Sequence, residues 1–134
     1  MKVFTNGCFD ILHRGHLELL SYCSQLSCPS MGGWMIVGLN SDDSIKRIKG
    51  KNRPINNQKD RKFALESLKF VDEVYIFEED TPYELIKSVS PDVIVKGGDY
   101  AHKEIVGETL CEVKIFDYLE GYSSTNLISK KMLC

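Results

Sequence analysis

The chain has 134 residues, 43% of them hydrophobic and 27% charged, which is the length and composition of one globular domain covering residues 1–134. Its formal charge of −2, from 17 Lys and Arg against 19 Asp and Glu, excludes bulk electrostatic attraction to nucleic acid or to an anionic membrane. No apolar run is long enough to cross a bilayer and no signal peptide is present, so we expect a cytoplasmic protein without a membrane partner. The five cysteines are odd in number and irregularly spaced, which argues against a disulfide framework and predicts that most are buried.

Short apolar strands alternate with helices along the first half of the chain. The first predicted helix carries Leu17 and Leu20, which are expected to face inward. In chain order the predicted elements are a strand at 2–5, a helix at 16–25, a strand at 34–39 and a short helix from a Ser41 cap to 48.

The second half continues the alternation. A longer helix offers Phe63 and Leu65 to the core, and Thr81 followed by Pro82 is typical of a capped helix start. The predicted elements are a helix at 58–70, a strand at 71–77, a helix from the Thr81 cap to 88, strands at 93–96 and 113–116, and a last helix to about 132.

Strands separated by helical crossovers pair in parallel, because only antiparallel neighbours are joined by tight turns. The sequence therefore predicts an α/β fold, a doubly wound sheet of about five parallel strands with helices on both faces. Such sheets bind ligands beyond the carboxyl ends of their strands. The polar and glycine-rich segments of this chain follow its predicted strands, so we expect one site at that edge.

The segment from Asn6 to His16 carries the clearest chemistry. It has a glycine turn at Gly7 and then His13 and His16, which share one face at the start of a helix with Gly15 between them. Imidazoles at a helix N-terminus suit the phosphate oxygens of a nucleotide. The alternatives are ordinary polar residues near a turn, or a metal site that adds Cys8 or Asp10, although the spacing is not diagnostic of a metal.

Three further segments are candidates for the same site. A basic cluster at 46–53 follows a strand end, and we favour a phosphate-clamping role for Lys46 over the alternative of a solvated loop, with Lys49 on the same face. Hydroxyl groups at a helix start, which can bind phosphate or merely cap the helix, come from Ser123, Ser124 and Thr125. Lys96, Gly98 and Asp99 end another strand and suit a base or ribose, and Arg61 is a candidate for phosphate contact or for a subunit interface.

The residues from Gly7 to His16, with those from Gly121 to Thr125, resemble the two signature motifs of the cytidylyltransferase-like nucleotidyltransferases. The similarity extends over roughly residues 2–128. Within that family the chain is most similar to the adenylyltransferase domain of the bifunctional enzymes that make ADP-heptose for lipopolysaccharide. That similarity rests on the stretches 4–10, 37–42, 53–56, 95–100 and 120–123.

The resemblance implies a Rossmann-like fold and an enzyme that joins a nucleoside monophosphate from ATP to a phosphorylated sugar such as heptose 1-phosphate, releasing pyrophosphate. Two alternatives remain: a CTP-dependent enzyme acting on glycerol 3-phosphate or another alcohol phosphate, and a nucleotide-binding protein without turnover. Tyr118 stands where the glycerol-phosphate enzymes usually have arginine, which favours the sugar-phosphate branch. The resemblance also implies a homodimer.

Charge stabilisation is the catalytic task, because one anion must attack another. We expect His13, His16 and Lys46 to be catalytic and Lys49 and Arg61 to bind substrate. Mg²⁺ is expected to arrive with the triphosphate, without a metal site built from protein ligands alone. The residues expected to bind the nucleotide are Thr5, Asn6, Gly7, Cys8, Phe9, Asp10, Gly15, Lys96, Gly98, Asp99, Gly121, Ser123, Ser124 and Thr125.

Overall fold

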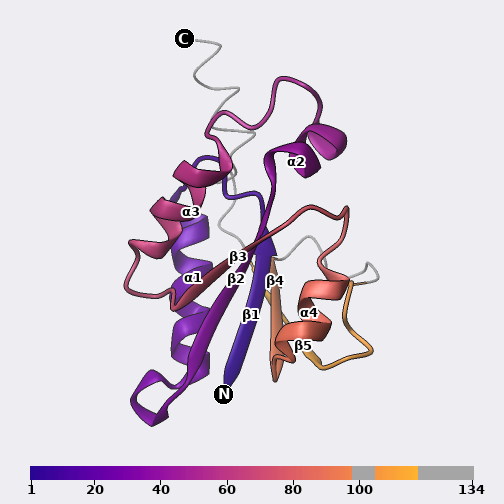
Figure 1. Ribbon diagram of the computed structural model, residues 1–134. Coiled ribbons are helices and arrows are strands. Elements are labelled where there is room, and N and C mark those ends of the chain that lie inside the picture. Colours follow the sequence, from indigo (N-terminus) through magenta and orange to yellow (C-terminus); the bar gives the residue numbers. More distant parts are fainter. Residues whose placement is uncertain (98–104, 118–134) are drawn as a thin grey trace.

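The computed structural model describes residues 1–97 and 105–117, and within these ranges five strands form one parallel sheet (Figure 1). The strands are β1 (Lys2–Gly7), β2 (Trp34–Asn40), β3 (Glu73–Phe77), β4 (Val93–Gly97) and β5 (Glu112–Phe116). The helices are α1 (Arg14–Ser27), α2 (Asp42–Lys49), α3 (Gln58–Glu66) and α4 (Tyr83–Val89), with a short 3-10 helix at Pro29–Met31.

The sheet has the strand order β3-β2-β1-β4-β5, with β1 at its centre. Val3 of β1 pairs with Met35 of β2 on one side and with Val93 of β4 on the other, in parallel register. The chain first moves outward to β2 and β3 and then crosses back to β4 and β5, so the winding direction reverses between β1 and β4. This reversal is the switch point at which open α/β sheets bind ligands. The expected doubly wound, Rossmann-like sheet is confirmed.

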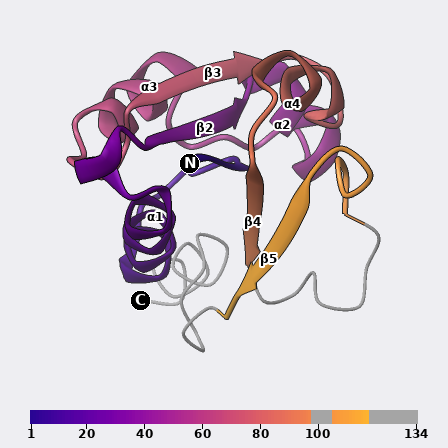
Figure 2. The same cartoon turned by 90° about the horizontal axis from the view of Figure 1, so that it is seen from below.

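Two apolar cores lie on opposite faces of this sheet. Val3 and Phe4 are both fully buried but belong to different cores, because successive side chains of a strand point to opposite faces. Leu20 of α1 and Leu65 of α3 pack into the Val3 core, and Ile86 of α4 packs into the Phe4 core. Figure 2 shows α1 and α4 on either side of the sheet, so helices cover both faces as expected.

Helix α1 corrects one core expectation. The helix begins at Arg14, earlier than expected, and its inward face is set by Gly15, Leu19 and Cys23 at four-residue spacing. Leu17 lies off that stripe and is 36% exposed, so its predicted inward position was wrong, whereas Leu20 is fully buried.

Helices α3 and α4 also differ from the prediction, α3 in its end and in one core residue, and α4 in its N-terminal cap. Helix α3 ends at Glu66 instead of residue 70, because beyond it the N–H of Leu68 bonds the carbonyl of Leu65, three residues back, and the chain tightens into a turn. Phe63 is 73% exposed, so the expectation that it enters the core was wrong, while Leu65 is fully buried. Helix α4 begins after Pro82 without a side-chain cap, so the predicted Thr81 cap was also wrong.

The cysteines are less buried than expected. Cys23 is buried in the core beneath α1, Cys8 and Cys111 are half-buried, and Cys28 is exposed. Most of the cysteines in the described ranges therefore remain partly accessible.

The carboxyl ends of the strands share one edge of the sheet, and the connections that bear the predicted site lie there. Helix α2 lies beyond the end of β2, above the sheet in Figure 1. The loop after β1 and the loop before α3 meet at the same edge through hydrogen bonds between Asp10 and Asn56. In the part of the chain that the structure describes, none of the helices is both long and apolar enough to span a bilayer.

The turn between α1 and β2 requires glycine at one position for lack of space. A Cβ on Gly33 would lie 1.7 Å from the carbonyl oxygen of Ser27, which is backbone that cannot rotate away, whereas one on Gly32 meets nothing within 4 Å. We predict that Gly33→Ala lowers the free energy of unfolding by about 3 kcal/mol or more. Gly32→Ala carries only the cost of its positive φ of 82°, about 1–2 kcal/mol. Urea denaturation of both variants checks this, and equal losses would contradict it.

Candidate active site

Two imidazoles lie where α1 begins, directly after the loop that follows β1. His13 is the N-cap residue, and its Nδ1 accepts a hydrogen bond from the backbone N–H of His16 over 3.4 Å. The two rings stack with their centroids 3.8 Å apart, and Phe9 packs on His16 with a centroid distance of 5.1 Å. Because Nδ1 of His13 accepts, its ring proton is assigned to Nε2. The expected pairing of the two histidines is thus present, with Gly15 buried between them in the first turn.

Burial keeps both imidazoles uncharged near neutral pH. It lowers the pKa of His13 below its ordinary value. Burial lowers the pKa of His16 to about 3, helped by His13 and by the positive charge of Lys49 and opposed by the backbone of Ile11. Two neutral rings beside a cation favour the approach of an anion, which would in turn raise their pKa values.

Phe9 holds an uncommon backbone conformation in the same loop. Its φ of 45° lies in the left-handed region, which is costly for an aromatic residue, and its side chain is only 5% exposed. The ring packs against that of His16 at the bend of the chain. Phe9 therefore shapes the loop beneath the imidazoles, and its predicted place in a nucleotide pocket is untested.

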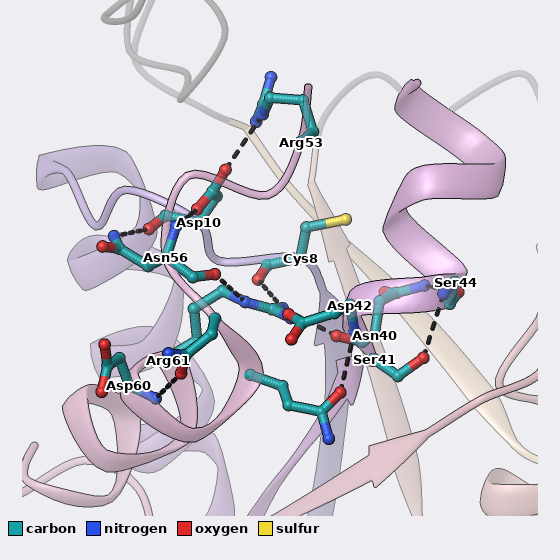
Figure 3. A network of polar contacts seen from close by, with 12 residues as sticks. Cys8, Asp10, Asn40, Ser41, Asp42, Ser44, Arg53, Asn56, Asp60 and Arg61 are labelled. Carbon is teal, nitrogen blue, oxygen red and sulfur yellow. Dashed lines mark hydrogen bonds and ion pairs between the residues drawn. The ribbon is translucent and has the colours of Figure 1, made fainter. Parts of the chain in front are cut away.

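Asp10 fastens this loop to the segment before α3 (Figure 3). Its buried carboxylate accepts hydrogen bonds from the backbone N–H groups of Ile55 and Asn56 at 2.8 and 2.9 Å and from Nε of Arg53 at 3.0 Å. The side-chain Nδ2 of Asn56 also donates a hydrogen bond of 2.7 Å to the backbone carbonyl of Asp10. Burial alone would raise the pKa of Asp10, but these donors outweigh it and hold the pKa below its usual value. Asp10 therefore holds the two loops together, and its contact with a nucleotide stays a prediction.

Arg61 joins the ends of two strands from beneath the same network (Figure 3). Its side chain is fully buried, and Nη1 donates to the carbonyls of Cys8 at 2.9 Å and of Asn40 at 2.7 Å. Nη2 pairs with Asp42 at 2.8 Å, and Nε donates to the carbonyl of Asn56 at 2.9 Å. Four of the five N–H donors of Arg61 are therefore engaged inside the protein, and its substrate contact stays a prediction. Arg61 is a positioning residue that ties the loop after β1 to α2 and α3.

The side chains near the β1–β4 junction are also engaged internally. The hydroxyl of Thr5 donates to the carbonyl of Val95 at 2.8 Å, so this predicted nucleotide contact is a link between strands. Nζ of Lys96 donates to the side-chain oxygen of Asn6, and burial lowers the pKa of Lys96 to about 8. Lys96 and Asn6 thus form one polar pair at the switch point, where both were expected to meet the nucleotide.

Of the two lysines on α2, Lys49 is the one whose charge acts on the histidine loop. Burial raises the pKa of the Cys8 thiol, and Lys49, Arg61 and Arg53 oppose that rise through their positive charge. Lys49 also acts on His16. The positive charge of Lys49, which no ion pair neutralises in the described ranges, therefore acts on the histidine loop, and positive charge suits a polyphosphate.

Lys46 lines a pocket that does not include the two histidines. This open pocket of about 290 Å³ is lined by Asp42, Lys46, Pro54, Ile55, Asn56, Asn57 and Asp60. Its lining mixes an ammonium group, two carboxylates and two amides, which are groups that hydrogen-bond hydroxyls. Lys46 and Lys49 therefore serve neighbouring surfaces, although the sequence suggested a common one.

Sequence reasoning placed Arg53 in the basic cluster at 46–53 without favouring a functional role for it, and it did not single out Asn56 as a site residue. The stretch 53–56 was among the segments that carried the resemblance, and that was the available signal. The predicted residues Gly98, Asp99, Gly121, Ser123, Ser124 and Thr125 lie outside the described residues. Gly7 is the last residue of β1 and Cys8 follows it in the loop, and a Cβ on Gly7 would lie 3.1 Å from the ring of Phe9.

No group of three or more His, Cys, Asp and Glu side chains is arranged to hold a metal ion within residues 1–97 and 105–117. Both carboxylate oxygens of Asp10 already accept hydrogen bonds from the protein. The side chains of the described residues therefore do not fit a Mg²⁺ site made of protein ligands alone.

The Arg61 anchor predicts a large stability effect. Arg61→Met leaves the carbonyls of Cys8, Asn40 and Asn56 without their donor, so we expect a loss of about 3–5 kcal/mol in the free energy of unfolding. Arg47→Met is the matched control, because Arg47 is half-exposed and pairs with Asp80, and it should cost under about 1 kcal/mol. Urea denaturation measures both, and similar losses would show that Arg61 is not an anchor.

The low pKa of His16 predicts acid sensitivity. Below about pH 6.5 the unfolded chain protonates this ring while the folded protein does not until about pH 3, so stability is lost as the pH falls between these values. One such group contributes at most about 1.4 kcal/mol per pH unit. We expect His16→Gln to flatten the fall in unfolding free energy between pH 6.5 and 4 in urea titrations. Parallel curves for variant and wild type would refute the buried neutral ring.

Comparison with known proteins agrees with this geometry. A family model described as cytidylyltransferase-like matches residues 4–130. The bifunctional protein HldE of a Nitratiruptor species is 55% identical over 98% of this chain, and that of Helicobacter pylori is 50% identical over 96%. This chain spans only 28% and 27% of those two relatives.

Among solved structures, a lipopolysaccharide core biosynthesis protein from Thermoplasma volcanium superposes with a TM-score of 0.67 at 28% identity. The match covers 92% of this chain and 98% of that one. A match of the family model over nearly the whole length, with relatives above 50% identity, establishes the family. The chain belongs to the cytidylyltransferase-like family of nucleotidyltransferases.

Proposed function

We propose that this domain transfers a nucleoside monophosphate, from ATP in preference to CTP, to a phosphorylated sugar such as heptose 1-phosphate and releases pyrophosphate. One observation carries the proposal: two stacked, neutral imidazoles begin α1 beside the sheet's switch point, where the positive charge of Lys49 acts on His16. The site thus offers neutral hydrogen-bonding rings and positive charge to a polyphosphate.

The mechanism follows from electrostatics. The acceptor phosphate has a second pKa near 6, so at pH 7 it is mostly ionised and needs no general base. The barrier comes from bringing this anion to the α-phosphate of the donor. We assign His13 and His16 to the α-phosphate, where hydrogen bonds strengthen as charge develops, and Lys49 to the triphosphate beside them. The bound anion stabilises the protonated form of His16, so its pKa rises in the complex.

Lys46 belongs to the acceptor side in this scheme. The pocket that it lines carries Asp42, Asn56 and Asp60, whose oxygens and amide suit the hydroxyls of a sugar, and its ammonium suits a phosphate. A pocket rich in polar groups favours a hydroxylated acceptor. The Thermoplasma relative's role in lipopolysaccharide core biosynthesis points the same way.

Mg²⁺ belongs to the proposal only as a companion of the triphosphate, whose charge it neutralises when bound. No step is assigned to it, because the described side chains build no cage for it. We further propose that the protein acts in the cytoplasm as a homodimer, which light scattering after gel filtration tests.

The experiment that tests the function measures pyrophosphate release with ATP or CTP against a panel of phosphorylated sugars and alcohols. We expect turnover with ATP and heptose 1-phosphate to exceed every other pair. Greater turnover with CTP and glycerol 3-phosphate would replace the proposal by the cytidylyltransferase alternative. No turnover with any pair, while nucleotide still binds, would leave a nucleotide-binding protein.

The same assay tests His16. We expect His16→Ala to lower kcat by about 100-fold or more, equivalent to about 3 kcal/mol of transition-state stabilisation, with an unchanged circular dichroism spectrum. Lys51→Ala, in the exposed loop after α2, is the control and should retain wild-type kcat. Near-normal turnover by His16→Ala would remove this ring from the mechanism.

A further inference from the structure

Arg53 is a nearly buried cation that has no role in the proposed mechanism. It lies in the loop between α2 and α3, and 14% of its side chain is exposed. Its Nε donates to Asp10 at 3.0 Å, which fixes the plane of the guanidinium at the outer edge of the network in Figure 3. Asp10 is fixed in turn by two backbone N–H groups, so Arg53 has a rigid support.

The far side of this guanidinium has spare hydrogen-bonding capacity. Its Nη2 atom is buried and has no hydrogen-bond partner among residues 1–97 and 105–117. Buried donors without partners are rare and costly, and each one in a native protein calls for an explanation. The planar fork of a guanidinium matches the oxygens of a phosphate.

The charge balance around Arg53 favours an anion. The positive charges of Arg53, Lys49 and Arg61 all act on the thiol of Cys8 and oppose the rise of its pKa. Two carboxylates, those of Asp10 and Asp42, pair with the two arginines. Among these five groups Lys49 has no carboxylate paired with it, and its positive charge also acts on His16.

Other arginines of the chain differ in this respect. Arg47 is half-exposed, and its guanidinium binds Asp80 and the carbonyl of Glu78 on the outside of α2. Arg14 is more exposed still and pairs with Glu18 one turn along α1. Arg61 is fully buried, with four hydrogen bonds to the protein. Arg53 alone among these four combines burial, a fixed plane and a buried donor atom without a partner in the described ranges.

We propose that Arg53, held in orientation by Asp10, binds a phosphate group of one of the two substrates. The inference rests on the proposed function and adds an anion-binding residue to its site. The phosphate belongs either to the nucleoside triphosphate or to the phosphorylated acceptor, and the experiment separates these two sources.

Calorimetric titration of the full chain measures the binding of ATP and of heptose 1-phosphate separately, without turnover. We expect Arg53→Gln to weaken one of the two ligands at least tenfold and to change the other less than twofold. The weakened ligand identifies the source of the phosphate. Arg47→Gln is the matched control, and it should change both dissociation constants less than twofold.

Unchanged affinity for both ligands in Arg53→Gln would overturn the inference. A wild-type chain that binds both ligands but shows no turnover would contradict the proposed function alone and leave this inference standing. A wild-type chain that binds neither ligand would overturn both.

A second measurement covers the case in which Arg53→Gln does not fold. In wild-type protein labelled with 15N-arginine, the side-chain resonance of Arg53, assigned by its loss in Arg53→Lys, should shift when pyrophosphate or heptose 1-phosphate is added. The Arg47 resonance should stay in place. An Arg53 signal that moves with neither ligand would refute the proposal.

Discussion

A buried guanidinium holds the active edge of this protein together. Arg61 donates to the carbonyls that end the β1 and β2 region, at Cys8 and Asn40, and to the segment before its own helix at Asn56. Carbonyls at strand ends have no partner in the sheet. A carbonyl that is buried without any hydrogen-bond donor lowers the stability of the folded protein. Arg61 satisfies two such carbonyls, at Cys8 and Asn40, and a third in the loop before α3, and Asp42 balances its charge. The loops that bear the site are therefore fixed before any ligand arrives.

Preorganisation of this kind has an electrostatic consequence. The guanidinium of Arg61 and the carboxylate of Asp10 are engaged in hydrogen bonds that hold the loops. The groups that remain for a ligand are the neutral imidazoles, the Lys49 ammonium and Nη2 of Arg53, which has no partner in the described ranges. Such a site is short of negative charge in the free protein, and a triphosphate with its acceptor supplies it. Groups held in place in advance lose little entropy at the moment of reaction, which is why fixed dipoles and cations stabilise a developing charge so well.

The fold could be predicted from the sequence because it depends on local patterns of apolar and polar residues. Alternating apolar strands and helices predicted the parallel doubly wound sheet, and the spacing of His13 and His16 predicted their common helix face. Contacts between residues that are far apart in the chain could not be predicted from the sequence. Nothing near Arg61 in the sequence reveals that its donors reach residues 8 and 40, and the different surroundings of Lys46 and Lys49 depend on how α2 sits beyond β2. The prediction for Phe63 was wrong for a related reason, because the buried face of α3 is formed by Arg61 and Leu65, and Phe63 lies off that face.

The central claim is that phosphates bind where α1 begins, between the stacked histidines and the cations of the α2 and α3 loops. A crystal structure of the protein with a non-hydrolysable ATP analogue and Mg²⁺ tests it most directly. The account predicts phosphate oxygens within hydrogen-bonding distance of His13 or His16, with Lys49 beside them and the Arg61 bonds intact. A triphosphate bound elsewhere, or histidine rings turned into the core away from it, would contradict the account.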